Sequence, residues 1–345
     1  MLLPALTAIA ALLFAALLVD QYRQRRHPYQ LAWALGATAF ALAAAAETLA
    51  SAVGWSEPLY RLWYISGAVW TAGWLGAGTI LLLTKTRFGY WYALCLALAG
   101  LFTVLVARRL EDPSAGSTAL LYALTTWGAS VAVGWLTYLG DHRWSRIAVG
   151  FTALLSALAL PLLVLATLPA PGWAVNPITG APVALLLPPA LRLLTPLLNI
   201  SGALALLTGA LFSIYVFMPK QRALPYSSDP GQRGDELLFN LLIAPVAITV
   251  NFVRSIPLAL QAWRAGTLNR RVPATALIAL GAFVPSLTDT LNRTGSTEFY
   301  QLGKLAGSVL LLLGFLASVD VIDEIRLPLV GRPLRRALHL LRHPR

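Results

Sequence analysis

The sequence predicts an all-α membrane protein, a polytopic transmembrane helical bundle of about nine spans. Of its 345 residues 58% are hydrophobic and only 12% are charged, whereas a soluble domain has roughly 25% charged residues. The mean hydropathy is +0.70, and the apolar residues form continuous runs near the ~20 residues that cross a bilayer core. Because these runs do not alternate with polar residues, they predict helices and not the strands of a closed barrel.

The apolar runs divide into one lone helix and a series of helical hairpins. The first run, 2–20, has no basic segment before it and no small-residue cleavage site, so we interpret it as a span and not as a signal peptide. The other eight runs pair into four in–out–in hairpins, each of which begins and ends on the same side. The predicted spans are 2–20, 30–53, 60–84, 89–107, 118–139, 147–168, 193–218, 272–291 and 301–320.

The net charge of +12 indicates orientation, because most of the basic residues fall in alternate loops. By the positive-inside rule the basic side is cytoplasmic, so the N-terminus is expected outside and the C-terminus inside a bacterial inner (cytoplasmic) membrane. The charge is thereby explained without nucleic acid, which we exclude as a partner. We expect anionic lipid to be bound at the cytoplasmic face.

One apolar segment, 237–253, is short and contains Pro245. If it crossed the membrane, the basic tail would lie outside, so we predict an interfacial or re-entrant helix on the cytoplasmic face and keep an additional span as the alternative. The expected organisation is spans one to seven in 1–222, a cytoplasmic-face insertion in 223–271, spans eight and nine in 272–322, and a basic amphipathic tail in 323–345.

The hairpins resemble one another in sequence. "PLYRLWYISGAV" (58–69) is similar to "EFYQLGKLAGSV" (298–309), which predicts a hairpin repeat. Small residues recur early in each outside-to-inside helix, where they would let backbones approach one another. The glycines expected at such contacts are Gly67, Gly73, Gly76, Gly128, Gly134, Gly202, Gly209, Gly303 and Gly307.

Ionisable residues lie near the outer ends of the spans, where a membrane helix rarely carries them. We predict that Glu47 pairs with Arg61 and that Asp289 pairs with Lys304, with Glu57 as the rival partner of Arg61. These pairs would either clamp the hairpins together or line a ligand site between hairpins 2–3 and 8–9. The residues expected to line that binding site are Glu47, Tyr60, Arg61, Tyr64, Asn199, Asp289, Asn292, Tyr300 and Lys304.

The sequence contains no P-loop, no GxSxG and no HExxH motif, so we predict no catalytic residues. The single cysteine, Cys95, lies in an apolar run, and the four histidines lie in basic, loop-like stretches. We therefore expect no metal and no cofactor. Lys304 near the start of the last span nevertheless leaves a retinal- or pigment-binding protein as an alternative, with Asp289 as the counter-ion.

The runs "RRHPYQLAWALGATAFALAAAAETLA" and "LYRLWYISGAVWTAGWLGAGTILLL" resemble a family of uncharacterised bacterial multi-span membrane proteins. The first run is also similar to the seven-helix membrane sensor regions of bacterial histidine kinases. The resemblance implies a multi-pass topology. We expect a non-catalytic binding, sensor or scaffold protein, either alone or as a subunit with a protein partner or a second copy of the chain. A secondary transporter of a small or amphipathic molecule and an intramembrane enzyme are the alternatives.

Overall fold

The computed structural model describes residues 2–177, 180–221, 244–269, 271–293 and 299–317. These residues form an all-helical fold without strands; a single isolated bridge joins Val175 to Pro182. The tail predicted over 323–345 and the part of the insertion before residue 244 lie outside the described residues.

Within the described residues ten helices are long and apolar enough to cross a membrane, which indicates a multi-pass membrane protein. Nine of them coincide with the predicted spans, and the third span is a continuous helix with three parts, α3, η1 and α4. The elements are α1 (Leu2–Arg25), α2 (Pro28–Val53), α3 (Glu57–Trp63), η1 (Tyr64–Thr71), α4 (Ala72–Leu82), α5 (Phe88–Ala107), α6 (Ala115–Tyr138), α7 (Trp144–Val164), α8 (Pro189–Phe217), α9 (Ala244–Arg264), α10 (Arg271–Arg293) and α11 (Tyr300–Ala317), with a short 3₁₀ turn, η2 (Ala184–Leu186).

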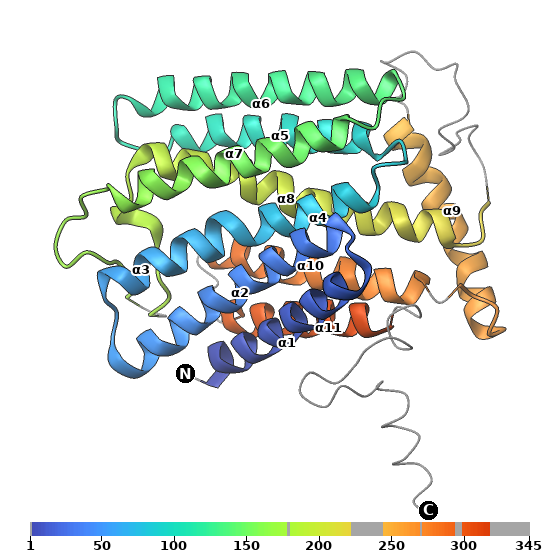
Figure 1. Ribbon diagram of the computed structural model, residues 1–345, viewed down its shortest axis with the longest axis horizontal. Helices are drawn as coiled ribbons and strands as arrows, with labels where there is room; N and C mark the ends of the chain where they lie inside the picture. Colours follow the sequence, from blue (N-terminus) through green and yellow to red (C-terminus); the bar gives the residue numbers. More distant parts are fainter. Residues whose placement is uncertain (1, 178–179, 222–243, 270, 294–298, 318–345) are drawn as a thin grey trace, which may run out of the picture.

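The spans run side by side along one axis, and α9 alone crosses the end of the bundle (Figure 1). Helix α8 lies inside the bundle and contacts α4, α5 and α10. Helix α1 does not stand alone, because it packs against both α2 and α11. The predicted hairpin partners α5 and α6, and likewise α10 and α11, are packed neighbours; the internal repeat itself stays a prediction.

Glycines set the closest helix crossings. A Cβ built on Gly76 of α4 would lie 2.6 Å from the Cα atom of Gly202 in α8, so neither position has room for a side chain. Close backbone approach through glycine is a common way to pack membrane helices, as the sequence predicted here. The prediction was wrong for Gly128, because no atom lies within 4 Å of the corresponding Cβ position on the exposed side of α6.

Candidate functional site

Glu47 is the buried acid at the centre of the candidate site. It lies on the face of α2 that carries Ala43, Ala46 and Ala50, all of them buried. These alanines let the next span come close: a Cβ on Gly67 in η1 would lie 3.0 Å from the Cβ of Ala43. Glu47 itself is only 3% exposed, so its carboxylate depends on partners within the protein.

Three side chains from two other helices donate hydrogen bonds to the Glu47 carboxylate. Lys304 Nζ of α11 lies 2.5 Å from Oε1, and Trp63 Nε1 of α3 donates to the same oxygen at 2.9 Å. Gln301 Nε2 of α11 donates to Oε2 at 2.9 Å. A buried ion pair is tolerated when further hydrogen bonds satisfy its lone pairs, and this carboxylate meets that condition. The Lys304 ammonium also lies over the ring of Tyr300, 4.9 Å from its centroid.

Helix geometry explains why Lys304 contacts Glu47 and not Asp289. Gly303 packs against Thr288 of α10, and Gly307 packs against Pro285. Lys304 follows Gly303 by one residue, a rotation of about 100°, so it points away from α10. Gln301 precedes Lys304 by three residues and shares its face. The predicted Asp289–Lys304 pair was therefore wrong, and the ion pair of Lys304 instead joins α11 to α2.

The predicted pair of Glu47 with Arg61 was also wrong. Arg61 pairs with Glu57 at 2.5 Å, one helical turn earlier, which was the rival prediction. Its guanidinium also donates to the backbone carbonyls of Leu163 and Ala166, at the C-terminal end of α7, where unpaired carbonyls attract a cation. Trp63, two residues later, faces Glu47; a rotation of about 200° turns Arg61 to the opposite side of α3.

Aromatic rings surround Trp63. Its ring lies 5.7 Å from that of Tyr60, 5.9 Å from that of Tyr64 and 6.4 Å from that of Trp55. The tyrosine hydroxyls are used elsewhere: Tyr60 donates to the carbonyl of Val183, and the Tyr64 oxygen lies 2.6 Å from Thr195 Oγ1. The two predicted tyrosines thus support Trp63 and do not contact Glu47 through their hydroxyls.

The other predicted site residues lie apart from Glu47. Asn199 is half-buried on α8 and Asp289 is half-buried on α10, and none of the hydrogen bonds found among the described side chains connects either one to the carboxylate. The side chain of Asn292 lies outside the described residues. Of the nine predicted residues, the structure brings Glu47, Tyr300 and Lys304 together. Sequence reasoning missed Trp63 and Gln301.

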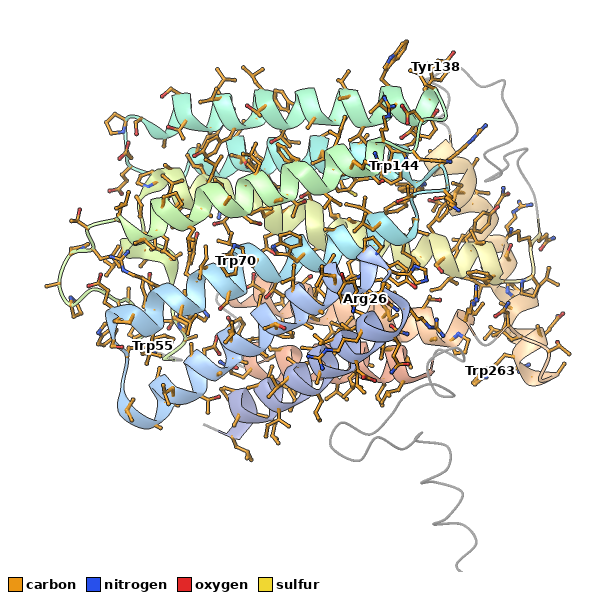
Figure 2. All side chains as sticks on the ribbon, in the orientation of Figure 1. Arg26, Trp55, Trp70, Tyr138, Trp144 and Trp263 are labelled. Carbon is orange, nitrogen blue, oxygen red and sulfur yellow. The ribbon has the colours of Figure 1, made fainter. Side chains whose placement is uncertain are left out.

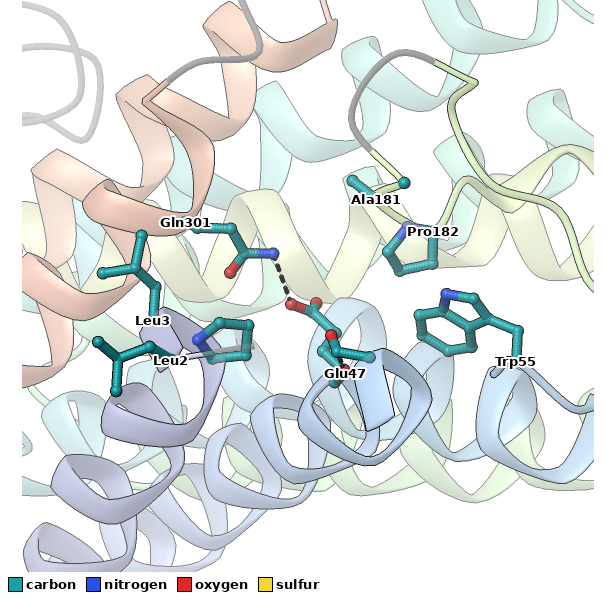
Figure 3. A pocket seen from close by; sticks show the side chains of 10 residues that line it. Leu2, Leu3, Glu47, Trp55, Ala181, Pro182 and Gln301 are labelled. Carbon is teal, nitrogen blue, oxygen red and sulfur yellow. Dashed lines mark hydrogen bonds between the residues drawn. The ribbon is translucent and has the colours of Figure 1, made fainter. Parts of the chain in front are cut away.

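A pocket of about 360 Å³ lies beside the carboxylate (Figure 3). Glu47 and Gln301 form its polar part, and most of the remaining wall is apolar. The amide oxygen Gln301 Oε1 is buried and has no hydrogen-bond partner among the residues that the structure describes. Lys304 is not among the residues of the wall, which are Leu2, Leu3, Pro4, Glu47, Ser51, Trp55, Gly180, Ala181, Pro182 and Gln301.

The helix that carries Trp63 continues as η1, a π-helix over Tyr64–Thr71. Thr71 Oγ1 donates to the carbonyl of Ser66 at 2.8 Å, five residues earlier. Such segments often occur at functional sites in membrane and soluble proteins alike. Nothing in the hydropathy of "YISGAVWT" distinguished it from an ordinary helix.

No protein-family model, curated protein or solved structure matches the chain. The resemblance found in the sequence therefore stays a prediction. Within the described residues no group of histidine, cysteine and acidic side chains is arranged to hold a metal ion.

Proposed function

We propose that this chain is a multi-pass protein of a bacterial cytoplasmic membrane that binds a small molecule in the pocket beside Glu47, as a binding or sensor protein without catalytic activity. The proposed ligand is small and mostly apolar, and carries an uncharged hydrogen-bond donor such as a hydroxyl or an amide N–H.

The distribution of charge supports the orientation. The bundle end opposite the pocket carries basic residues at the end of α1, in the α4–α5 turn, at the start of α7, in α9 and at the start of α10. By the positive-inside rule this end is cytoplasmic, which places the pocket near the outer surface. The described basic residues of this end are Arg23, Arg25, Arg26, Lys85, Arg87, Arg143, Arg146, Lys220, Arg254, Arg264 and Arg271.

The observation that carries the proposal is the pocket itself, whose wall includes the Glu47 carboxylate and the Gln301 amide. A purely structural clamp needs the contacts of Glu47 with Lys304, Trp63 and Gln301, but it needs no cavity next to them. The carboxylate and amide oxygens of Glu47 and Gln301 are hydrogen-bond acceptors, so this wall suits a ligand that donates a hydrogen bond. The volume of about 360 Å³ is at the small end of ligand pockets, which span roughly 300–1,000 Å³.

The electrostatics of the site favour an uncharged donor over a cation. Lys304 already neutralises Glu47 at 2.5 Å, so an ammonium group in the pocket would gain little from the carboxylate and would be repelled by the lysine. Leu2, Leu3 and Trp55 supply an apolar wall for the rest of the molecule. The side chains of Lys304, Trp63 and Gln301 are all hydrogen-bonded to the Glu47 carboxylate. Such a site is better suited to binding a molecule than to catalysing its conversion.

The test is native mass spectrometry of the protein gently extracted from its own membranes. We expect a bound small molecule that is lost in Gln301→Leu, a variant that removes the amide acceptor and keeps the Glu47–Lys304 pair. The matched control is Glu57→Gln, which changes an acid at the same end of the bundle outside the pocket wall. Bulk lipid alone in every sample would refute the proposal, and a retained protein partner would favour the scaffold alternative.

A secondary transporter is the second candidate, and the π-helix favours it. A π-helical turn inside an α-helix is frequent at functional sites, and η1 follows directly on Trp63, which donates a hydrogen bond to Glu47. Reconstituted vesicles that accumulate the ligand identified by mass spectrometry would support transport. Binding without flux would leave the binding or sensor role.

A further inference from the structure

Helix α9 begins and ends at the same end of the bundle. Before it, the backbone N–H of Gln221 donates to Ser255 Oγ of α9 at 2.9 Å. After it, the guanidinium of Arg271, the first residue of α10, lies 4.9 Å from the ring centroid of Phe217, the last residue of α8. A helix of 21 residues is about 30 Å long. If α9 crossed the membrane beside the other spans, α10 would begin at the opposite end of the bundle.

The side chains of α9 form three sectors around its axis. One sector packs on the bundle and includes Ala247, Ile248, Asn251 and Ser255, all buried. A second sector is apolar and exposed: Val253 is 56% exposed, Ile256 40%, Leu260 47% and Trp263 65%. The third is polar and exposed, with Arg254 and Gln261. A helix surrounded by hydrocarbon would not be expected to expose a polar sector, and a helix surrounded by water would not be expected to expose an apolar sector.

We propose that α9 lies in the headgroup layer of the basic leaflet, with its apolar sector in lipid and its arginines on anionic headgroups. The occupant of its exposed face is thus the anionic lipid of the surrounding bilayer. Figure 1 shows α9 across the bundle end, and Trp263 (Figure 2) stands at its far end, as is common for tryptophan at a membrane–water interface. The inference is independent of the pocket, and with it the helices of the described residues would cross the membrane nine times.

Charge complementarity identifies the lipid class. Arg254 and Arg264 are exposed on α9, and the neighbouring loops carry the basic residues of the same bundle end. Only Asp20 and Asp141 are acidic among the described residues there. Basic side chains at this depth extend their charged ends to the headgroups while their stems stay in the apolar layer.

The depth of α9 is tested by spin labels on single cysteines in a Cys95→Ala background, in vesicles of phosphatidylcholine and phosphatidylglycerol. We expect labels at Val253→Cys, Ile256→Cys and Leu260→Cys to be accessible to oxygen at a common shallow depth, ~5–10 Å below the surface. Labels at Arg254→Cys and Gln261→Cys should contact a water-soluble nickel complex. A depth that is greatest near residue 254 and decreases toward both ends would mean that α9 crosses the membrane, and would overturn the proposal.

The lipid class is tested by native mass spectrometry of the protein released from the same vesicles. Removing both arginines, in Arg254→Gln/Arg264→Gln, should lower the preference for phosphatidylglycerol roughly fivefold for each arginine removed. The matched control is Arg108→Gln/Arg109→Gln, which removes two arginines from the loop at the opposite end of the bundle and should leave the preference unchanged. An equal effect of the two pairs, or no effect of either, would refute anionic lipid as the occupant of α9.

Discussion

The ion pair between Glu47 and Lys304 gives the sharpest prediction, because both partners are buried and each depends on the other. The pair is 2.5 Å long, and the side chains are 3% and 10% exposed. Lys304→Met leaves the carboxylate without its cation, a change that typically costs ~3–5 kcal/mol. Trp63 and Gln301 still donate to it, so we expect a loss at the lower end of that range, about 3 kcal/mol in the free energy of unfolding.

Removing the acid should cost less than removing the lysine. In Glu47→Gln the long lysine stem can extend its ammonium toward the nearby end of the bundle, so we expect a loss of ~1–2 kcal/mol. The double variant Glu47→Gln/Lys304→Met leaves no unpaired buried charge and should lose no more than ~1–2 kcal/mol. The two substitutions should therefore be coupled by at least ~2 kcal/mol.

The assay is reversible unfolding in mixed detergent micelles, followed by tryptophan fluorescence, for the two single variants and the double variant. The control cycle combines Lys304→Met with Asp289→Asn, the partner that the sequence predicted and the structure does not pair with it. Effects in the control cycle should add within ~0.5 kcal/mol. Additive effects of Glu47→Gln and Lys304→Met would refute the reasoning, because they would mean that water or lipid headgroups already satisfy both charges.

Three further predictions follow from local geometry. Gly76→Ala should destabilise the protein by ~1–3 kcal/mol, because the new Cβ would meet the backbone of α8. Gly128→Ala should instead stabilise it by up to ~1 kcal/mol, because that site is open and alanine favours the helix. Thermal unfolding of the two variants tests both predictions. Arg61→Gln should speed hydrogen exchange at the C-terminal end of α7, whose carbonyls the guanidinium binds, and unchanged exchange would contradict this. Hydrogen bonds from the hydroxyl and the backbone N–H of Ser114 hold the pKa of Asp112 below its ordinary value of 3.8. The stability that these bonds contribute is therefore complete above pH 3.8 and is lost as the pH falls through the lowered pKa. In Ser114→Ala the pKa of Asp112, followed by NMR, should rise toward 3.8, and an unchanged pKa would contradict the assignment.

Nine of the ten apolar helices found among the described residues could be predicted as spans because hydropathy sums over about twenty residues, so no single side chain decides a span. Each predicted range overlaps an observed helix, from Leu2–Arg25 to Tyr300–Ala317. The π-helical register of η1 could not be predicted, because it depends on one shifted hydrogen-bond pattern and changes no composition. The environment of Trp63 was missed for a similar reason. A tryptophan near a span end is typical of a membrane–water interface, so its position gave no sign that its indole N–H donates to Glu47.

Partner choice among the buried charges depends on helix rotation, which hydropathy does not report. Sequence reasoning paired charges across the nearest loop, Glu47 with Arg61 and Asp289 with Lys304, and both pairs were wrong. The sequence nevertheless holds a signal for α11. Gly303 and Gly307 are four residues apart and form one face, and that face packs on α10. Lys304 and Gln301 lie on the next face, so orienting the helix by its glycines before pairing its charges directs Lys304 away from Asp289. The same order of reasoning, packing face first and charge second, should improve the pairing of ionisable residues in other membrane bundles with glycine faces.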